Sequence, residues 1–210
     1  MFNRPSVQDA LKRFAAGSLP LLDIPNPVWY PGNEDLLDFY VRPNFQLKEF
    51  AVSVLKRVNS KQANQKNAPT ILIDRRLASG LQSLRNRIVS AYPNAGIRLE
   101  SGHRPPAIDR MVGGSGGGLH TLGRAGDCSF LNVDPKLSPE AVRRGVAYEA
   151  YRQKDYPILG IELIIGTNVH FDVGRINPWY AMQALSHGRY VYPLISPIKE
   201  LAPYCLPKFK

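Results

Sequence analysis

The sequence predicts an α+β domain with an extension at each end. Helical patterns alternate with short strand-like runs, and no internal repeat is present. The chain has 210 residues, of which 44% are hydrophobic, so one domain with a substantial core is expected. No apolar run reaches about 18 residues, so no membrane-spanning helix is expected.

Residues 1–42 are proline-rich and are expected to form an N-terminal arm. One helix is predicted in SVQDALKRFAAG, where Ser6 is the candidate N-cap and Gly17 the stop signal. The other apolar and aromatic residues of this segment follow neither a helical nor an alternating period, which predicts an extended chain lying against a surface. The segment also lacks the uninterrupted apolar core of a signal peptide.

Residues 43–174 carry the regular patterns and are expected to form the domain itself. An apolar-rich stretch, NFQLKEFAVSVLKRVN, opens it. A helix is predicted over residues 77–92, because Leu81, Leu84 and Ile88 fall on one face. The next segment, GIRLESG, alternates apolar and charged residues as a strand does.

A second strand is predicted in GRAGDCSFLNV, and a second helix from Ser138 to about Lys154. The stretch YPILGIELIIGTNVHFDVG predicts one or two strands interrupted near Gly166. Residues 175–210 are again rich in proline and aromatic residues and are expected to form a C-terminal extension.

The formal net charge of +10 indicates acidic partners, such as nucleic acid, cell-wall polymers or an acidic protein surface. The densest basic segment, RRLASGLQSLRNR, fits the solvated face of a helix, and no nucleic-acid motif accompanies it, so nucleic-acid binding is disfavoured. Cys128 and Cys205 lack the paired spacing of a cysteine zinc site and are expected to be reduced thiols.

The clearest chemical signal is VGGSGGGLHTLGRAGDCSF. Five glycines precede His120, Asp127 follows seven positions later, and His170 lies in the later segment NVHFD. Two imidazoles and one carboxylate make a three-ligand zinc site that leaves a fourth position open. The spacing alone leaves a second interpretation, in which these are unconnected surface or core residues.

The glycines of this stretch have two expected purposes. Gly123 and Gly126 would reverse the chain between His120 and Asp127, and the run before His120 would let the backbone or a substrate strand pass close to the metal.

Five segments in order, NFQLKEF, LQSLRNRI, IRLESGHRPPAIDRMVGG, LHTLGRAGD and VHFD, resemble the zinc D-Ala-D-Ala carboxypeptidases and L-alanyl-D-glutamate endopeptidases. The resemblance covers roughly residues 43–174 and implies the hedgehog-type peptidase fold, a small antiparallel sheet with flanking helices. It implies a Zn²⁺ cofactor and hydrolysis of peptide bonds in the peptidoglycan stem. Because the family is common among bacteriophages, it also implies a phage protein made in the bacterial cytoplasm and then associated with the virion.

Position by position, the resemblance implies that His120, Asp127 and His170 are the zinc ligands. Arg104 matches the cation that holds the substrate carbonyl or carboxylate and stabilises the oxyanion; the alternative is a structural salt bridge. Asp172 lies two residues beyond His170 on the same strand face, where it would orient an imidazole.

The general base is the main departure from the family. Thr167 and Asn168 stand where relatives often carry a Glu three residues, or a His two residues, before the last histidine, and neither accepts a proton at neutral pH. Glu162 is the candidate base, although eight extended residues span about 26 Å, so a bend at Gly166 and Thr167 would have to fold the strand back towards His170. The alternative is a buried or salt-bridged glutamate.

Three other residues also differ from the family or lie outside the match. Gly118 replaces the serine that usually stands two residues before the first ligand. His103 is expected to be a packed or substrate-facing ring rather than a fourth ligand, and His187 is expected on the surface.

Two functions remain compatible with the sequence. One is a zinc peptidase that hydrolyses the peptidoglycan stem. The other is a structural component of a virion or other large assembly that has kept the peptidase fold, which the missing base, the extra glycines and the terminal extensions favour. In that case we expect the extensions to contact other subunits.

Overall fold

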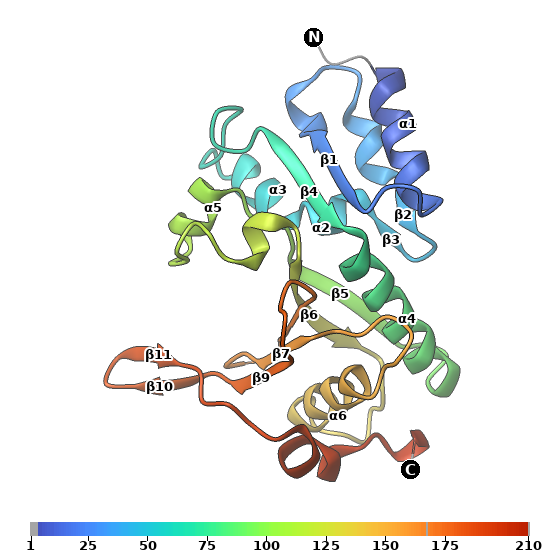
Figure 1. Cartoon of the computed structure of the whole chain (residues 1–210), viewed down its shortest axis with the longest axis vertical. Coiled ribbons are helices and arrows are strands. Elements are labelled where there is room, and N and C mark those ends of the chain that lie inside the picture. Colours follow the sequence, from blue (N-terminus) through green and yellow to red (C-terminus); the bar gives the residue numbers. More distant parts are fainter. Residues whose placement is uncertain (1–3, 167, 210) are drawn as a thin grey trace. The chain divides into compact units, whose positions relative to one another are not determined.

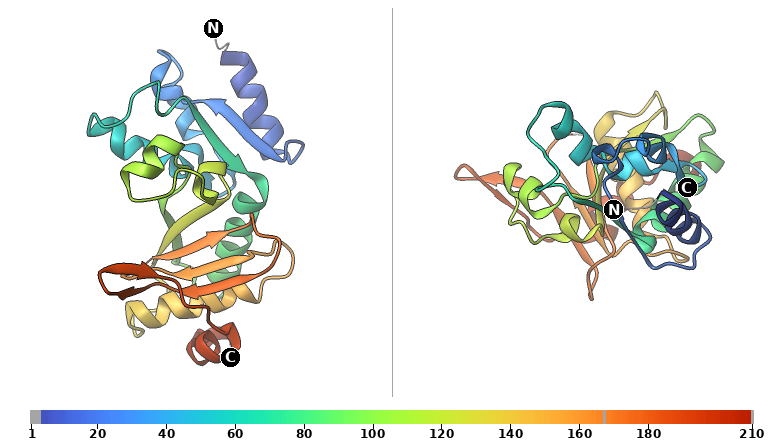
Figure 2. Two further views of the ribbon diagram at one scale, coloured as in Figure 1. Left: turned by 60° about the vertical axis from the view of Figure 1, so that its left-hand side comes forward. Right: turned by 90° about the horizontal axis from the view of Figure 1, so that it is seen from above.

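The computed structural model describes residues 4–166 and 168–209 (Figures 1 and 2). Helices and several small sheets alternate along the chain, which confirms the α+β class. The chain divides into two compact units, residues 1–82 with 99–126 and residues 83–98 with 127–210. None of the described helices is long and apolar enough to cross a membrane.

The first unit begins with α1 (Arg4–Ala15) and β1 (Leu21–Pro25). The helix buries Val7, Leu11 and Phe14, which recur at helical spacing on one face. β1 pairs antiparallel with β4 (Thr70–Asp74). The helix expected near Ser6 is therefore present, but it includes Arg4, so Ser6 lies within it and is not its N-cap. Part of the segment predicted to be an extended arm is a paired strand.

The middle of the first unit contains short elements. They are the 3₁₀ turns η1 (Pro27–Trp29) and η2 (Glu34–Asp38), the hairpin of β2 (Tyr40–Arg42) and β3 (Phe45–Gln46), and the helices α2 (Leu47–Phe50) and α3 (Val52–Asn59). A capping box starts α2, because Gln46 N–H donates to Glu49 Oε2 over 2.7 Å. Val54 of α3 belongs to a buried apolar cluster with Ala68 and Ile108.

The predicted long helix is α4 (Arg75–Ala91), and the strand after it is β5 (Gly96–Ser101). Leu81, Leu84 and Ile88 are all buried, as the periodicity predicted. The glycine run lies between α5 (Pro106–Met111) and the 3₁₀ helix η3 (Leu119–Leu122), which is followed by β6 (Ala125–Leu131).

The largest sheet has five strands in the order β5-β6-β8-β7-β9. Its last three strands in sequence are β7 (Gly160–Leu163), β8 (Val169–Asp172) and β9 (Trp179–Met182). β7 and β8 are antiparallel, whereas β7 and β9 are parallel. The expectation of an antiparallel sheet is thus wrong for the β7–β9 pair, in which a strand of the C-terminal extension joins the sheet.

The second unit is completed by α6 (Pro139–Tyr151), which packs against β7 (Figure 2). Ser138 caps it by accepting a hydrogen bond from Ala141 N–H. The hairpin of β10 (Ala184–Ser186) and β11 (Arg189–Val191) projects from this unit (Figure 1). The short turns η4 (Pro197–Leu201), η5 (Ala202–Tyr204) and η6 (Pro207–Phe209) end the chain, and the first two pack on α6.

Candidate metal centre

His120 lies in η3 and is 5% exposed. Its Nδ1 is 2.8 Å from the carbonyl oxygen of Gly102. A carbonyl only accepts hydrogen bonds, so Nδ1 is the donor in this contact. A neutral imidazole held in this way offers Nε2 to a metal, with its tautomer fixed by a backbone oxygen.

The carbonyl group that contacts the His120 ring belongs to Gly102, which directly follows β5. Only glycine fits at position 102, because a Cβ there would overlap the backbone of Phe50. The next residue, His103, donates its N–H to Phe50 O over 2.8 Å, and Arg104 donates its N–H to His120 O over 3.1 Å. The motif residues 102–104 are therefore fixed to α2 and to the first candidate ligand.

Asp127 on β6 and His170 on β8 contact each other directly. Asp127 Oδ1 is 2.9 Å from His170 Nδ1, and the two side chains are 14% and 13% exposed. On the other side of the ring, His170 Nε2 is 3.4 Å from Oδ2 of Asp172. Asp172 is fully buried and accepts a hydrogen bond of 2.8 Å from Arg175 Nε.

Gly160 makes room for the Asp172 carboxylate. The two residues are partners in the β7–β8 pair, and a Cβ at position 160 would overlap the carboxylate. The Asp172 carboxylate thus lies within reach of the His170 ring.

The two carboxylates set the charge of His170 in the metal-free protein. Burial lowers the pKa of His170, but Asp127 and Asp172 together outweigh burial and raise it to about 9. The ring is therefore cationic at neutral pH. A metal cation would replace the Nδ1 proton, which lies between the ring and Asp127, while Nε2 stays directed at Asp172.

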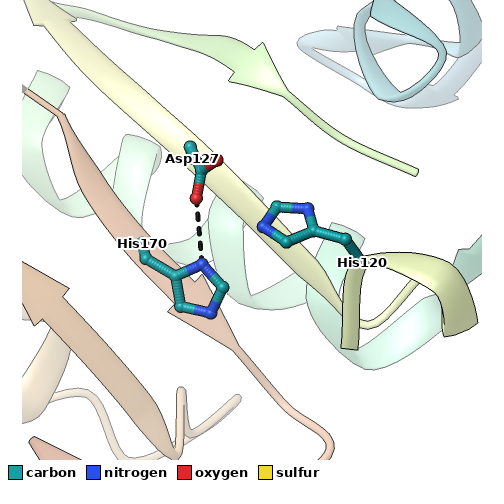
Figure 3. Close-up of side chains that lie close together, drawn as sticks. All are labelled: His120, Asp127 and His170. Carbon is teal, nitrogen blue, oxygen red and sulfur yellow. Dashed lines mark hydrogen bonds and ion pairs between the residues drawn. The ribbon is translucent and has the colours of Figure 1, made fainter. Parts of the chain in front are cut away.

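The three predicted ligands come together in the structure. One ligand atom from each of His120, Asp127 and His170 lies within 4.8 Å of the other two (Figure 3). A cluster of this composition can hold a metal ion, and Gly102 O and Asp172 supply the outer partners that orient its two imidazoles. In residues 4–166 and 168–209 it is the one such group of three or more His, Cys, Asp or Glu side chains.

Glu162 lies directly opposite His170 in the antiparallel β7–β8 pair. Directly opposed residues project to the same face of a sheet. The reversal passes through Gly166, whose φ is +106°, while Thr167 lies outside the described residues. Burial raises the pKa of Glu162, and the neighbouring His170 charge lowers it in part. The bend that the sequence argument required is therefore present.

Arg104 forms an ion pair with Asp109, whose Oδ1 is 3.2 Å from Arg104 Nε. Asp109 is 4% exposed, and its Oδ2 accepts a hydrogen bond of 2.9 Å from Gly116 N–H. Gly114 also approaches this carboxylate so closely that a Cβ would overlap it. Two glycines of the run, Gly114 and Gly116, thus lie against the Asp109 carboxylate, and the close approach of Gly114 explains why glycine is needed there.

Gly123 and Gly126 differ in what they contribute to the turn between the ligands. Gly123 caps η3 in the left-handed region with φ of +66°, and a Cβ there would overlap the backbone of Leu72. Gly126 lies within β6, and a Cβ there would make ordinary contacts with Leu99 and Ser101 at 3.5 and 3.6 Å. The expected requirement for glycine therefore holds at position 123 and not at position 126.

The other two histidines stay outside the cluster. His103 is 3% exposed, and burial lowers its pKa to about 4, so the ring is neutral. His187 is exposed at the β10–β11 turn, as predicted. Cys128 is buried and Cys205 is partly buried, and neither is in a disulfide bond.

Sequence reasoning assigned no role to Asp109, which pairs with Arg104 and accepts from Gly116 N–H. The sequence offered one signal for it, since Asp109 is the one acidic residue between Glu100 and Asp127.

Comparisons with models of protein families, with curated proteins and with solved structures gave no match.

Proposed function

We propose that this chain is a zinc metallopeptidase that hydrolyses peptide bonds of the peptidoglycan stem, of the D-Ala-D-Ala carboxypeptidase or L-alanyl-D-glutamate endopeptidase type. The observation that carries the proposal is the convergence of His120, Asp127 and His170 within 4.8 Å, with Glu162 directly opposite His170. The order of the motifs, which resembles that of phage and bacterial wall peptidases, supports it.

The donor set suits zinc. Two imidazoles and one carboxylate, with a fourth position open, are typical of catalytic zinc, while calcium and magnesium prefer oxygen ligands throughout. When bound, zinc supplies Lewis-acid chemistry, which polarises a carbonyl group and makes water more acidic.

Glu162 is the residue that moves the proton. Burial raises the pKa of Glu162 towards neutral pH. A carboxylate with such a pKa can accept a proton from water and then deliver it to the leaving amine. Arg104 is the cation that meets negative charge developing on the carbonyl oxygen. Asp172 holds the His170 ring through Nε2 and leaves Nδ1 directed towards Asp127.

The net charge of +10 fits an anionic cell-wall substrate, because it favours approach through screened, non-specific attraction. A phage setting accounts for both the motif resemblance and the wall substrate.

A structural role in a virion or other assembly is the second candidate. It is favoured by the projecting β10–β11 hairpin, where the opposed residues Leu185 and Tyr190 are 63% and 60% exposed. Exposed apolar pairs of this kind are typical of surfaces that contact another protein. A virion-borne wall peptidase would combine both functions.

The first test is the metal content of the purified protein, measured by elemental analysis beside His120→Ala and, as a control, the exposed His187→Ala. The same samples are incubated with purified peptidoglycan. One zinc per chain and release of stem-peptide fragments, both lost in His120→Ala alone, is the expected result. Zinc without hydrolysis would favour the structural role, and a wild type without zinc would overturn the metallopeptidase.

A further inference from the structure

Asp172, Gly160 and Trp179 lie side by side across the largest sheet, on β8, β7 and β9. Gly160 is paired with Asp172 on one side and with Trp179 on the other. Glu162, two residues further along β7, lies opposite His170. Alternate residues of a strand share a face, so the Asp172 carboxylate and the Trp179 ring lie on the face of the sheet that carries His170.

The Arg175 side chain joins the two outer members of this row. Its Nε donates to Asp172 Oδ2 over 2.8 Å, and its Cζ lies 4.0 Å from the centre of the Trp179 ring. Among the described residues this is the shortest cation–aromatic contact, the next being 4.9 Å. The ring fixes the plane of the guanidinium group and the carboxylate fixes the direction of Nε, so Arg175 is held from both sides.

Asp172 depends on this arginine for its position. The carboxylate is fully buried, and its Oδ1 has no hydrogen-bond partner among the described residues. Its Oδ2 accepts the 2.8 Å hydrogen bond from Arg175 and faces His170 Nε2 at 3.4 Å. Because the contact with Arg175 is the shorter of the two, removing the guanidinium group would leave a buried carboxylate that only a long contact orients.

The charge of Arg175 also reaches the candidate base. Burial raises the pKa of Glu162, and the charges of His170 and then of Arg175 lower it in part. This dependence agrees with the register of the sheet, which places Asp172 and Glu162 on one face. Arg175 therefore acts on the face of the sheet that carries the cluster.

We propose that Arg175 is a positioning residue of the metal centre: held by Trp179, it fixes Asp172, which in turn orients the His170 ring. Partners of this kind, beyond the ligands themselves, set the orientation of metal-binding imidazoles. The C-terminal extension, which was expected to begin at residue 175, thus supplies part of the support of the metal site. The inference rests on the metal site of the proposed function and is independent of which bond is cleaved.

The test measures metal binding rather than turnover. The dissociation constant for Zn²⁺ is obtained on the full-length protein by competition with a chromophoric chelator, and the visible absorption spectrum of the Co²⁺-loaded protein reports the geometry of the ligands. Arg175→Gln is expected to weaken Zn²⁺ binding by about tenfold and to change the Co²⁺ spectrum. Arg175→Lys keeps the charge but not the planar fork of donors, so its loss should be about threefold.

The Trp179 variants test the aromatic contact. Trp179→Ala removes the ring beside Arg175 and should weaken Zn²⁺ binding by about fivefold, whereas Trp179→Phe keeps an aromatic face and should stay within about twofold of the wild type. Arg144→Gln is the matched control, since Arg144 also joins a carboxylate, Glu140, to an aromatic ring, Tyr204. It should leave the affinity and the Co²⁺ spectrum unchanged. Thermal melts of the metal-free proteins establish that each variant is folded.

The outcomes separate this role from the proposed function. A wild type that binds Zn²⁺ with an affinity and a Co²⁺ spectrum that Arg175→Gln does not change overturns the positioning role, even if peptidoglycan is cleaved. An equal loss of affinity in Arg144→Gln also overturns it, because the effect would then come from the general stability of the fold. Dependence on Arg175 without cleavage sustains the role and removes the peptidase, and a wild type that binds no Zn²⁺ overturns both. If Arg175→Gln does not fold, Arg175→Lys and the two Trp179 variants decide.

Discussion

Glu162 and His170 are directly opposed across the antiparallel β7–β8 pair, although eight positions separate them in the sequence. Asp127 and Asp172 both contact the His170 ring, one at each nitrogen. Glu162 accepts no hydrogen bond among the described residues, and burial raises its pKa. Asp127 and Asp172 therefore hold the His170 ring, whereas the Glu162 carboxylate is available to transfer a proton.

Replacing Glu162 by Gln should abolish most of the turnover and leave the metal in place. The amide keeps the size of the side chain but does not accept a proton at neutral pH, so kcat is expected to fall by about 10² to 10⁴. Zinc content and KM should stay close to those of the wild type. Steady-state kinetics on a stem peptide, together with elemental analysis, measure all three quantities.

The exposed Glu34 provides the control, since Glu34→Gln removes one negative charge far along the chain from the cluster. Its kcat should equal that of the wild type. If Glu162→Gln also kept full activity, Glu162 would not be the base, and the role would pass to another group.

Asp172→Asn should weaken zinc binding by about 10- to 100-fold. Asn preserves the shape of the side chain but loses the negative charge that faces His170 Nε2 and Arg175. The dissociation constant is measured by competition with a chromophoric chelator. Asp155→Asn, at an exposed position, should leave it unchanged; equal affinities for Asp172→Asn and wild type would show that Asp172 does not support the ligand.

Local patterns explain what the sequence could predict. His120 and Asp127 are seven positions apart in one motif, and the buried face of α4 repeats with the helical period, so both can be recognised within a short window. The strand that includes His170 was also recognisable from its apolar run. Each of these signals lies within one segment of the chain.

Pairings between distant segments were harder to predict. The strand β1 pairs with β4, which lies more than forty residues later, and β9 pairs in parallel with β7. The residue pattern of a strand does not indicate which other strand it pairs with. The position of Glu162 depended on where the chain reverses after β7. The Ser53 hydroxyl accepts from Gly102 N–H across 49 positions of the chain, a contact that no spacing rule contains.

The stability of the metal-free protein should fall at alkaline pH because of His170. Its pKa is about 9 in the folded state, raised from 6.5, so the folded form binds the proton more tightly. The resulting stabilisation is fully present below about pH 6.5 and is lost as pH rises through about 9. We expect a loss on the order of 1–3 kcal/mol in the free energy of unfolding.

Urea denaturation of the chelator-treated wild type and His170→Gln, between about pH 6 and about pH 9.5, measures this loss. The variant lacks the titrating ring, so its stability should depend less on pH over that range. Parallel curves for the two proteins would mean that His170 does not titrate as described. Zinc binding by the wild type should also strengthen with rising pH, because the metal displaces the proton.

The turn that joins the first two ligands should tolerate alanine at one glycine and not at the other. Gly123→Ala places a Cβ against the Leu72 backbone at a φ of +66°, so we expect it to destabilise the protein by at least about 1–2 kcal/mol and to lower zinc affinity. Gly126→Ala meets its nearest neighbour, Leu99, at 3.5 Å and should change stability by less than about 0.5 kcal/mol. Urea denaturation and chelator competition on both variants test the pair. Equal effects would show that the chain reversal does not depend on the left-handed conformation of Gly123.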